Sequence, residues 1–283
     1  MYGDVMKKYI FIDIDGTLFD PVNHCVPESA KTALQLAKEN GHELFICTGR
    51  PKPVVESSYL DLPVSGIIYA GGGHIVINHQ TIYTALFPKD VLLKILDDFQ
   101  KQQISYTLEG IERNYYTEWT MQYFRNYFCK KASAESEMKD KFEHFIDIKP
   151  IHLLIEEDLQ QVSKIDLFAK NDERIHEYIK NLPECVEGFV YSVPIGDVIE
   201  AEILVSGVSK ASGIDRVLKY YGAKLEDSIA IGDSTNDLAM IEHAHIGVAM
   251  GNACDEIKEK AAFVTKRVDE DGLYHAFKEL KLI

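Results

Sequence analysis

The chain has 283 residues, of which 46% are hydrophobic and 27% are charged, values typical of a globular protein long enough for two domains. Its formal net charge of −15 argues against an extended basic surface for nucleic acid, and any phosphate site must gain its attraction locally. The five cysteines are widely spaced and include no CxxC pair, which argues against a zinc ribbon or a disulfide framework.

The first predicted strand is an apolar run that begins at Tyr9 and ends in two carboxylates, Asp13 and Asp15, before Gly16 and Thr17. Such a run is typical of a central strand in a parallel sheet, and residues two apart leave a strand on the same side. Ligands bind beyond the carboxyl ends of these strands, so both acids lie where chemistry is expected. Residues 1–8 lead directly into this strand, and no apolar stretch is long enough to span a bilayer, so we expect no signal peptide, no membrane segment and a cytoplasmic protein.

Two carboxylates so close repel each other unless a cation or a shared proton intervenes. Mg²⁺ is the simplest cation, because it binds carboxylates together with the phosphate oxygens of a substrate. One acid could then attack phosphorus, and the other could act as general acid and base. The alternative is a strand end with two solvated acids before a glycine turn.

The next elements continue an alternation of helices and strands. A helix is expected over residues 28–40, and a strand over 43–47 that ends in Thr48, Gly49, Arg50 and Pro51. Because Pro51 suits the first turn of a helix, Thr48 and Gly49 fall in a strand-to-helix turn, where a hydroxyl and free backbone N–H groups can face an anion.

A third strand is expected over residues 66–70, followed by Gly71, Gly72 and Gly73. Three successive glycines indicate positive φ angles or a backbone brought close to another group. A plain hairpin turn into a strand over residues 75–77 is the alternative.

Residues 84–204 show a different pattern and are read as an inserted α+β domain. Residues 130–141 are read as a loop or an exposed helix. The expected helices cover 88–103, 119–129 and 172–181, and the expected strands cover 104–108, 113–117, 151–155, 165–169, 189–193 and 198–203.

The first pattern resumes at residue 207 and belongs to the same parallel sheet. A helix that begins near Lys210 is expected to end at Tyr221, with Gly222 as its cap. A strand over residues 228–232 is followed directly by Asp233, Asn236 and Asp237. The later elements are helices over 238–243 and 255–261 and strands over 246–250 and 262–264.

Carboxylates and other polar groups therefore end several strands of one sheet, and Lys210 begins a helix beside them. The ordered set resembles the haloacid dehalogenase superfamily, in its Cof-like branch with an inserted α/β cap. The resemblance rests on six motifs: Asp13-Ile14-Asp15-Gly16-Thr17, Thr48-Gly49-Arg50, Gly207-Val208-Ser209-Lys210, Gly232-Asp233-Ser234-Thr235-Asn236-Asp237, Val248-Ala249-Met250-Gly251-Asn252-Ala253 and Asp271-Gly272.

The resemblance implies an α/β fold with a Rossmann-like three-layer core and a mostly parallel sheet, plus an inserted α+β cap. The catalytic core would comprise residues 1–83 and 205–283, and the cap residues 84–204. The implied activity is a Mg²⁺-dependent phosphatase of small phosphorylated metabolites, such as sugar phosphates or nucleotide and cofactor phosphates. The expected protein is a monomer or small homo-oligomer that binds neither nucleic acid nor membrane.

The resemblance also implies a role for each matching residue. Asp13 would be the nucleophile and a Mg²⁺ ligand, and Asp15 the general acid and base, with its backbone carbonyl on the metal. Thr48 and the Gly49 amide would hold phosphoryl oxygens, and Asn236 would contact phosphate. The remaining three roles concern charge: Lys210 would neutralise phosphate and hold Asp13, Asp233 would ligate Mg²⁺, and Asp237 would support the site without direct metal contact.

Two alternatives to hydrolysis remain open at this stage. A phosphomutase or phosphotransferase on the same core would move phosphate between positions with little release, and a phosphosugar-binding regulator would bind without turnover. The family usually has Asn-Gly-Ala where this chain has Gly71-Gly72-Gly73, and a glycine where Ala211 follows the lysine.

Residues outside the motifs have competing interpretations. His243 and His245 could hold a second metal but suit a helix end. Arg113 could contact an anionic substrate or lie on the surface. An aromatic group could line a pocket or form core, with core favoured by its helical spacing: Tyr115, Tyr116, Trp119, Tyr123 and Phe124.

Overall fold

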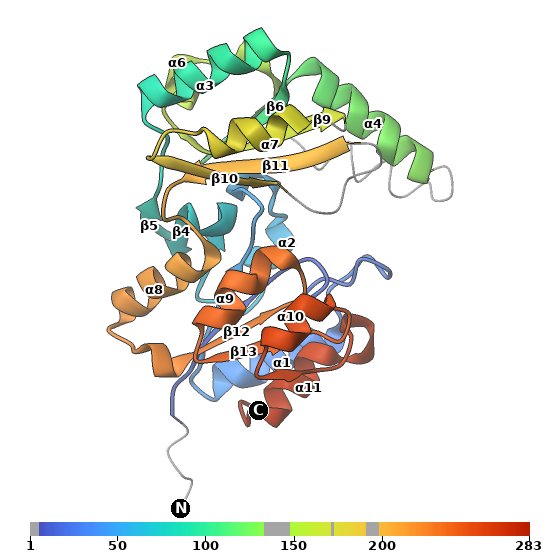
Figure 1. Ribbon diagram of the computed structural model, residues 1–283. Coiled ribbons are helices and arrows are strands. Elements are labelled where there is room, and N and C mark those ends of the chain that lie inside the picture. The colour runs from blue at the N-terminus through green and yellow to red at the C-terminus, as the bar shows by residue number, and fades with distance from the viewer. Residues whose placement is uncertain (1–5, 133–147, 171–172, 191–197) are drawn as a thin grey trace, which may run out of the picture. The chain divides into compact units, whose positions relative to one another are not determined.

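The chain folds into two compact units, each assembled from separate stretches of sequence (Figure 1). The computed structural model describes all residues except 1–5, 133–147, 171–172 and 191–197. We call residues 1–50, 57–83 and 209–283 the core unit, and residues 51–56 and 84–208 the inserted unit. Within the described residues, no helix is long and apolar enough to cross a membrane.

An eight-stranded sheet forms the centre of the core unit. Its strands are β1 (Tyr9–Ile12), β2 (Glu43–Cys47), β3 (Gly66–Tyr69), β4 (His74–Ile77), β5 (Gln80–Thr84), β12 (Ser228–Gly232), β13 (Ile246–Ala249) and β14 (Phe263–Val264). The order is β14-β13-β12-β1-β2-β3-β4-β5. Neighbours from β14 to β3 pair in parallel, and β3 and β4 are antiparallel. The predicted mostly parallel sheet is thus confirmed, and β12, β1 and β2 lie at its centre.

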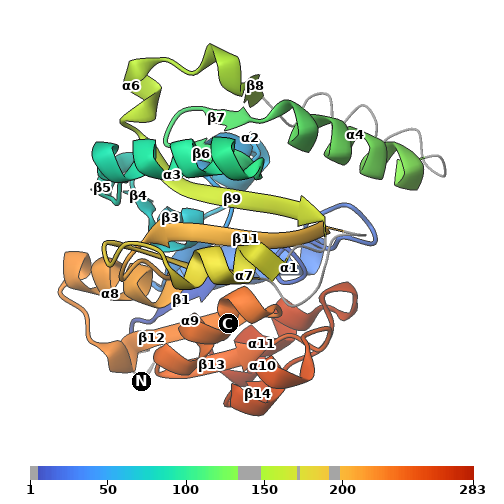
Figure 2. The same cartoon turned by 45° about the horizontal axis from the view of Figure 1, so that its top comes forward.

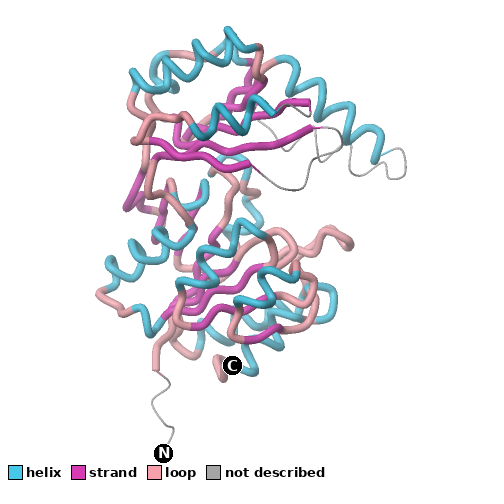
Figure 3. Tube along the Cα trace, in the orientation of Figure 1, coloured by secondary structure: helices cyan, strands magenta, loops and turns pink. Residues whose placement is uncertain are grey.

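Helices cover both faces of this sheet, which gives the three predicted layers (Figure 3). The helices α1 (Glu28–Glu39) and α11 (Gly272–Glu279) pack on each other. On the opposite face lie α8 (Lys210–Tyr221), α9 (Leu238–His243) and α10 (Asp255–Lys260). Their apolar side chains, such as Ile214 and Met240, pack against Phe11 and Phe45, which stack with ring centroids 5.2 Å apart.

Local sequence signals explain where these helices begin and end. In α1 the four predicted apolar positions are all buried, as one face of an amphipathic helix should be. Helix α8 begins with a reciprocal capping box between Ser209 and Ser212, and it ends at Gly222 in the left-handed conformation, as predicted. Three elements were not predicted from the sequence: β5, α11 and the short helix α2 (Ser57–Leu60).

A separate six-stranded sheet forms the inserted unit. Its strands are β6 (Ser105–Gly110), β7 (Asn114–Tyr116), β8 (Ile148–Pro150), β9 (Val162–Lys170), β10 (Val186–Val190) and β11 (Val198–Val205). The order is β10-β11-β9-β6-β7-β8, antiparallel throughout except for the parallel pair of β7 and β8. The long strands β9 and β11 run side by side (Figure 2).

One face of this second sheet packs against helices. The helices are α3 (Lys89–Gln102), α6 (Glu156–Leu159) and α7 (Glu173–Lys180), while α4 (Glu118–Ala132) contacts β6. Buried side chains of α3 and α7, such as Phe99 and Ile175, share one hydrophobic cluster with Ile165, Leu167 and Ile203 of the strands. Because side chains alternate along a strand, the residues next to these three along β9 and β11 point to the other face of the sheet.

Two expectations for individual elements were wrong. The strand predicted over residues 151–155 is instead β8, three residues earlier, followed by a 3₁₀ turn at Ile151–Leu153. The apolar run had suggested a buried strand, but Ile155 and Leu153 are exposed rather than packed in a core. The helix predicted after Pro51 is only a 3₁₀ turn, since Pro53 removes a further backbone donor. The predictions for residues 133–141, 172 and 191–193 lie outside the described residues.

Candidate active site

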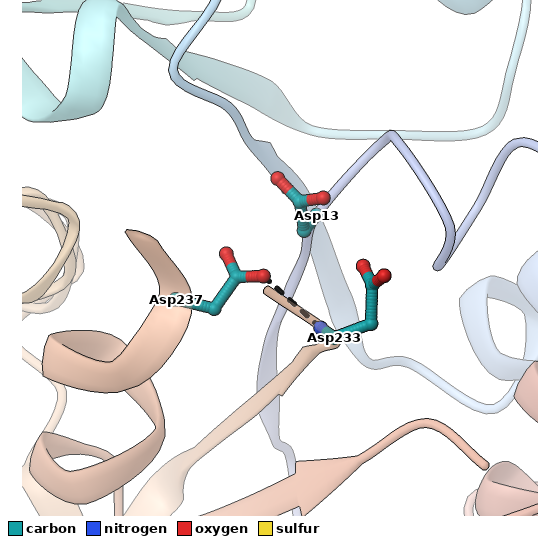
Figure 4. A group of neighbouring side chains, drawn as sticks. All are labelled: Asp13, Asp233 and Asp237. Carbon is teal, nitrogen blue, oxygen red and sulfur yellow. Dashed lines mark hydrogen bonds between the residues drawn. The ribbon is translucent and has the colours of Figure 1, made fainter. Parts of the chain in front are cut away.

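Three carboxylates from distant parts of the sequence meet at the centre of the core sheet. Asp13 follows β1 directly, Asp233 follows β12 directly, and Asp237 lies four residues further on. One oxygen from each lies within 4.8 Å of the others, and Figure 4 shows the three side chains around one point. Adjacent parallel strands end at the same edge of a sheet, so neighbouring strand ends bring these residues together.

Lys210 lies in this group and uses all three of its ammonium protons. Its Nζ donates to Asp13 Oδ1 at 2.6 Å, to Asp237 Oδ1 at 2.5 Å and to Asn236 Oδ1 at 3.3 Å. Burial alone would lower the pKa of Lys210, but the carboxylates of Asp13 and Asp237 outweigh it and raise that pKa. The lysine is therefore a fixed positive charge in the site.

Asp237 is fully buried and organises the loop after β12. Its Oδ2 accepts hydrogen bonds from the backbone N–H groups of Asp233 and Ser234, each at 3.0 Å, while its Oδ1 accepts from Lys210. Gly232 leaves room for this arrangement, since a Cβ there would lie 2.6 Å from Asp237 Cγ. Both oxygens of Asp237 thus hold protein groups in place.

Asp233 is held by two neighbours that the sequence analysis did not list as site residues. Thr17 Oγ1 donates to Asp233 Oδ1 at 3.0 Å, and Asn252 Nδ2 donates to Asp233 Oδ2 at 3.2 Å and to the Gly16 carbonyl at 2.8 Å. Gly16 has a φ of +82°, and a Cβ on it would lie 2.3 Å from Asp233 Oδ2. Only glycine allows the two loops to approach so closely.

The site carries more negative than positive charge. Burial, followed by repulsion from Asp237, raises the pKa of Asp13 to about 8 and that of Asp233 to about 6. A hard divalent cation would relieve this repulsion, and carboxylate oxygens are the ligands that Mg²⁺ prefers. The donor set therefore fits the predicted metal, with Asp13 and Asp233 as the carboxylates least committed to other protein groups.

Asp15 does not belong to the group of three converging carboxylates. Its side chain is 55% exposed and accepts hydrogen bonds from Arg50 Nε, at 2.9 Å, and from Arg50 Nη2. A bidentate pair of this kind fixes the orientation of a carboxylate. Arg50 belongs to the Thr48-Gly49-Arg50 motif but had no predicted role, and its position two residues after Thr48 was the signal available.

The other residues predicted to contact phosphate lie close to the group formed by Lys210 and the carboxylates. Thr48 follows β2 and is buried, and its Oγ1 accepts from the backbone N–H of Arg50 at 3.1 Å. A Cβ on Gly49 would lie 3.7 Å from Asn236 Nδ2, so the Gly49 backbone is next to Asn236. Thr48 and Gly49 thus lie at the end of β2, beside the strand that bears Asp13.

Gly71, Gly72 and Gly73 show both of the expected features, a hairpin turn and a backbone with positive φ angles that lies close to another group. It connects the antiparallel strands β3 and β4, and Gly71 and Gly72 both have positive φ. A Cβ on Gly72 would lie 2.2 Å from the carbonyl oxygen of Ser209, which caps the helix that begins with Lys210. Gly72 therefore lets α8 approach the hairpin closely.

The residues outside the motifs have local partners. His243 Nε2 lies 2.7 Å from Asp215 Oδ1, and the three aspartates remain the one potential metal group found in the described part of the chain. Arg113 donates to both oxygens of Asp158 at 3.0 Å.

The aromatic group is partly core. Tyr115 is buried in the hydrophobic cluster of the inserted unit and donates to Asp158. Trp119 stacks on Tyr123 with ring centroids 5.2 Å apart, and the side chain of Phe124 lies outside the described residues.

Comparison with known proteins independently supports the family that the sequence motifs resemble. A family model described as haloacid dehalogenase-like hydrolase matches residues 10–277. YkrA of Bacillus subtilis is 31% identical over 98% of this chain and 99% of its own length. The B. subtilis protein YitU, named 5-amino-6-(5-phospho-D-ribitylamino)uracil phosphatase, is 27% identical over 96% of this chain and 97% of its own length.

Solved structures agree with these sequence matches. A sugar phosphatase of HAD subclass IIB, BT4131, superposes with a TM-score of 0.78 at 28% identity, covering 98% of this chain and all of that one. The phosphatase BT1666 from Bacteroides thetaiotaomicron superposes with a TM-score of 0.79 at 26% identity, covering 100% of this chain and 98% of its own.

Proposed function

The chain belongs to the haloacid dehalogenase-like hydrolases, and on that premise we propose that it is a Mg²⁺-dependent phosphatase of small phosphorylated metabolites. One observation carries the proposal: Asp13, Asp233 and Lys210 come from three separate stretches of sequence and converge on one point. A solvated strand end would not collect a buried lysine and three carboxylates, because burial of unpaired charges is unfavourable.

Asp13 is the proposed nucleophile. A carboxylate oxygen of Asp13 would form a bond to phosphorus while the bond between phosphorus and the ester oxygen breaks. Water would then attack the phosphorus of phospho-Asp13 and release phosphate with regeneration of the carboxylate. Lys210, whose Nζ lies 2.6 Å from Asp13 Oδ1, would hold this side chain and neutralise charge on the transferring group.

Asp15 is the proposed general acid and base. It would protonate the leaving alcohol in the first step and remove a proton from the attacking water in the second. Arg50, which holds the Asp15 carboxylate through two nitrogens, would orient it for both steps.

Phosphate oxygens would be bound by the groups at the end of β2 and by Asn236. The Thr48 hydroxyl, the Gly49 backbone N–H and the Asn236 amide offer neutral hydrogen-bond donors for a dianion. Asp13, the Asp15 backbone carbonyl and Asp233 would hold Mg²⁺, which supplies positive charge to the phosphoryl group. Thr17 and Asn252 would fix the orientation of Asp233, as groups behind metal ligands commonly do.

The names of the compared proteins support the substrate class. One relative is named for a ribityl phosphate ester and one solved structure for a sugar phosphate. We include in the proposal that residues 84–204 act as a substrate-selecting cap, and that the protein works in the cytoplasm as a monomer or small homo-oligomer.

Replacement of Asp13 by asparagine tests this function. We expect Asp13→Asn to reduce phosphate release from p-nitrophenyl phosphate in Mg²⁺ by about 10³-fold or more, because an amide is a poor nucleophile. Asp61→Asn, a change at an exposed aspartate of the same unit, should leave the rate unchanged.

Three results would count against the proposal. Full activity in Asp13→Asn would contradict the nucleophile, and full activity in a chelator would contradict the metal. Phosphate that moves to another position of a sugar ester without release would indicate a mutase.

A further inference from the structure

A second buried group of charges lies in the inserted unit, on the sheet face opposite α3 and α7. Strand alternation defines this face: Ile165 and Leu167 pack in the hydrophobic cluster with the helices, so Lys164 and Asp166 point the other way. The strand register places Glu109 directly across from Lys164, and Glu202 directly across from Asp166.

Carboxylates outnumber cations in this group. Lys164 Nζ donates to Glu202 Oε1 at 2.9 Å, and it lies 3.0 Å from Glu109 Oε2 and 3.2 Å from Asp166 Oδ1. The four residues are only 4–9% exposed, and the half-buried Glu200 adds a fourth carboxylate near Asp166. One ammonium therefore faces four carboxylates.

Several buried polar atoms here are incompletely satisfied. Among the described residues, Glu109 Oε2, Asp166 Oδ1 and Asn114 Nδ2 are buried and have no partner at hydrogen-bond geometry. Asn114 is 1% exposed and lies directly across from Glu109 in the β6–β7 pair, while its Oδ1 accepts from the Gly110 N–H at 3.2 Å. Glu109 Oε2 and Asp166 Oδ1 form ion pairs with Lys164, at 3.0 and 3.2 Å, while Asn114 Nδ2 is a buried donor without an acceptor among the described residues, which is uncommon in a protein interior.

A metal ion does not suit this arrangement. Among the described residues, three converging metal-ligand atoms occur in the aspartate group of the core unit and not here, and the Lys164 ammonium is within 3.2 Å of both Glu109 and Asp166. One ammonium is shared among these carboxylates, and the remaining excess of negative charge favours a further cationic donor. The unpartnered amide of Asn114 requires an acceptor close to that donor.

We propose that this face of the inserted unit binds a protonated amine that carries a neighbouring hydroxyl group, as in an amino sugar or an amino alcohol. The amine would meet the carboxylates of Glu109, Asp166, Glu200 and Glu202, and the hydroxyl oxygen would accept from Asn114. It belongs either to the phosphate ester that is hydrolysed, in which case this inference rests on the proposed function, or to a separate free amine.

Protons are the competing way to neutralise the group. Burial and repulsion from Asp166 raise the pKa of Glu109 well above its usual range, and burial together with the same neighbour raises the pKa of Glu200 to about 8. A cation that binds here would displace protons from these carboxyls. A cluster with a purely structural role would keep its protons and would not bind amines.

The test compares esters that differ only by an amine and a hydroxyl. At pH 7 in Mg²⁺, we expect kcat/KM to be about tenfold higher for glucosamine 6-phosphate than for glucose 6-phosphate, or for ethanolamine phosphate than for ethylene glycol phosphate, mainly through KM. Glu202→Gln and Glu200→Gln should abolish this preference. Glu156→Gln, at an exposed glutamate of the same unit, should retain it.

Calorimetric titration with free glucosamine, and with glucose as control, separates the two sources. Binding of free glucosamine alone, lost in the same two variants, would identify a separate amine. If no ester pair favours the amine and free glucosamine does not bind, the inference is wrong and the group holds only protons. Turnover of p-nitrophenyl phosphate reports folding of each variant and tests the proposed function on its own, so that function can stand while this inference fails.

Discussion

Among the described residues, each unit of this protein buries one lysine among carboxylates, and the two groups differ in their charge balance and in the polar atoms that they leave unsatisfied. In the core unit, Lys210 donates all three protons to Asp13, Asp237 and Asn236. In the inserted unit, Lys164 donates to Glu202 and forms ion pairs with Glu109 and Asp166, at 3.0 and 3.2 Å, and the half-buried Glu200 adds a further carboxylate near Asp166.

The difference follows from how each group is assembled. The partners of Lys210 come from loops after β1 and β12, and loops can adjust each side chain to a common point. The partners of Lys164 stand on neighbouring strands, where the register fixes their spacing. A site at strand ends can therefore be fully organised in advance, whereas a group on a sheet face retains polar atoms that a ligand or a proton must satisfy.

The largest effect is expected at Lys210. Lys210→Met leaves the carboxylates of Asp13 and Asp237 buried without a cation, which should reduce the free energy of unfolding by about 3–5 kcal/mol in a chelator. Phosphate release in Mg²⁺ should also fall by about 100-fold or more. Urea denaturation and a phosphate assay measure the two effects.

Lys260→Met is the matched control for this change. Lys260 pairs with Glu242 on the surface, with exposed fractions of 54% and 46%, so its loss should change stability by less than about 0.5 kcal/mol. Equal effects of the two substitutions would mean that Lys210 does not compensate its neighbours.

The same substitution at Lys164 sharpens the contrast. Lys164→Met should destabilise the protein less than Lys210→Met, by about 1–3 kcal/mol, because Glu109 and Glu200 can hold protons when the cation is lost. Turnover of p-nitrophenyl phosphate should stay near the original rate, since this small ester has no amine. A loss of turnover as large as that of Lys210→Met would remove the distinction between the two groups.

A glycine beside α8 tests how Lys210 is positioned. Gly72 has a φ of +110°, and a Cβ on it would lie 2.2 Å from the carbonyl oxygen of Ser209. Gly72→Ala should therefore cost about 2 kcal/mol or more in stability and lower activity, because α8 must move. Thermal unfolding and phosphate release measure these effects.

Gly71→Ala provides the comparison for this strain. Gly71 has a φ of +59° and open space around its Cβ position, so the loss should be about 1 kcal/mol, with activity retained. If both alanine variants behave alike, backbone conformation alone matters and the approach of α8 does not.

The sequence could predict the core site because its signals are local. Asp13, Thr48 and Asp233 each follow a recognisable strand, and parallel strands end at one edge, so order along the chain implies proximity in space. The neighbours Thr17, Arg50 and Asn252 lay inside the same motifs, but their contacts depend on side-chain directions that a motif does not give.

The lysine group of the inserted unit could not be predicted in this way. Lys164 and Glu109 are 55 positions apart, and they meet only because β6 and β9 pair in one particular register. A change of that register by one residue would move either side chain to the opposite face. The misplaced strand at residues 151–155 has the same origin, since an apolar run shows neither its partner nor its exposure.

The smallest expected effect concerns protons in the inserted unit. Burial, then repulsion from Asp166 and Glu202, raises the pKa of Glu200 from 4.5 to about 8. Between these values the unfolded chain is ionised at Glu200 while the folded chain keeps its proton, so stability falls as pH rises from 5 to 8. Glu200→Gln cannot ionise, and relative to the original protein it should gain about 1 kcal/mol or more over that interval.

Urea denaturation at pH 5 and pH 8 in a chelator measures this gain. Asp13 contributes the same pH dependence to both proteins, so the difference between them isolates Glu200. Glu157→Gln, at an exposed glutamate of the same unit, should keep the original dependence. If Glu200→Gln also keeps it, the excess negative charge on this sheet face is not neutralised by a proton at Glu200, and only a bound cation or a different carboxyl could account for its burial.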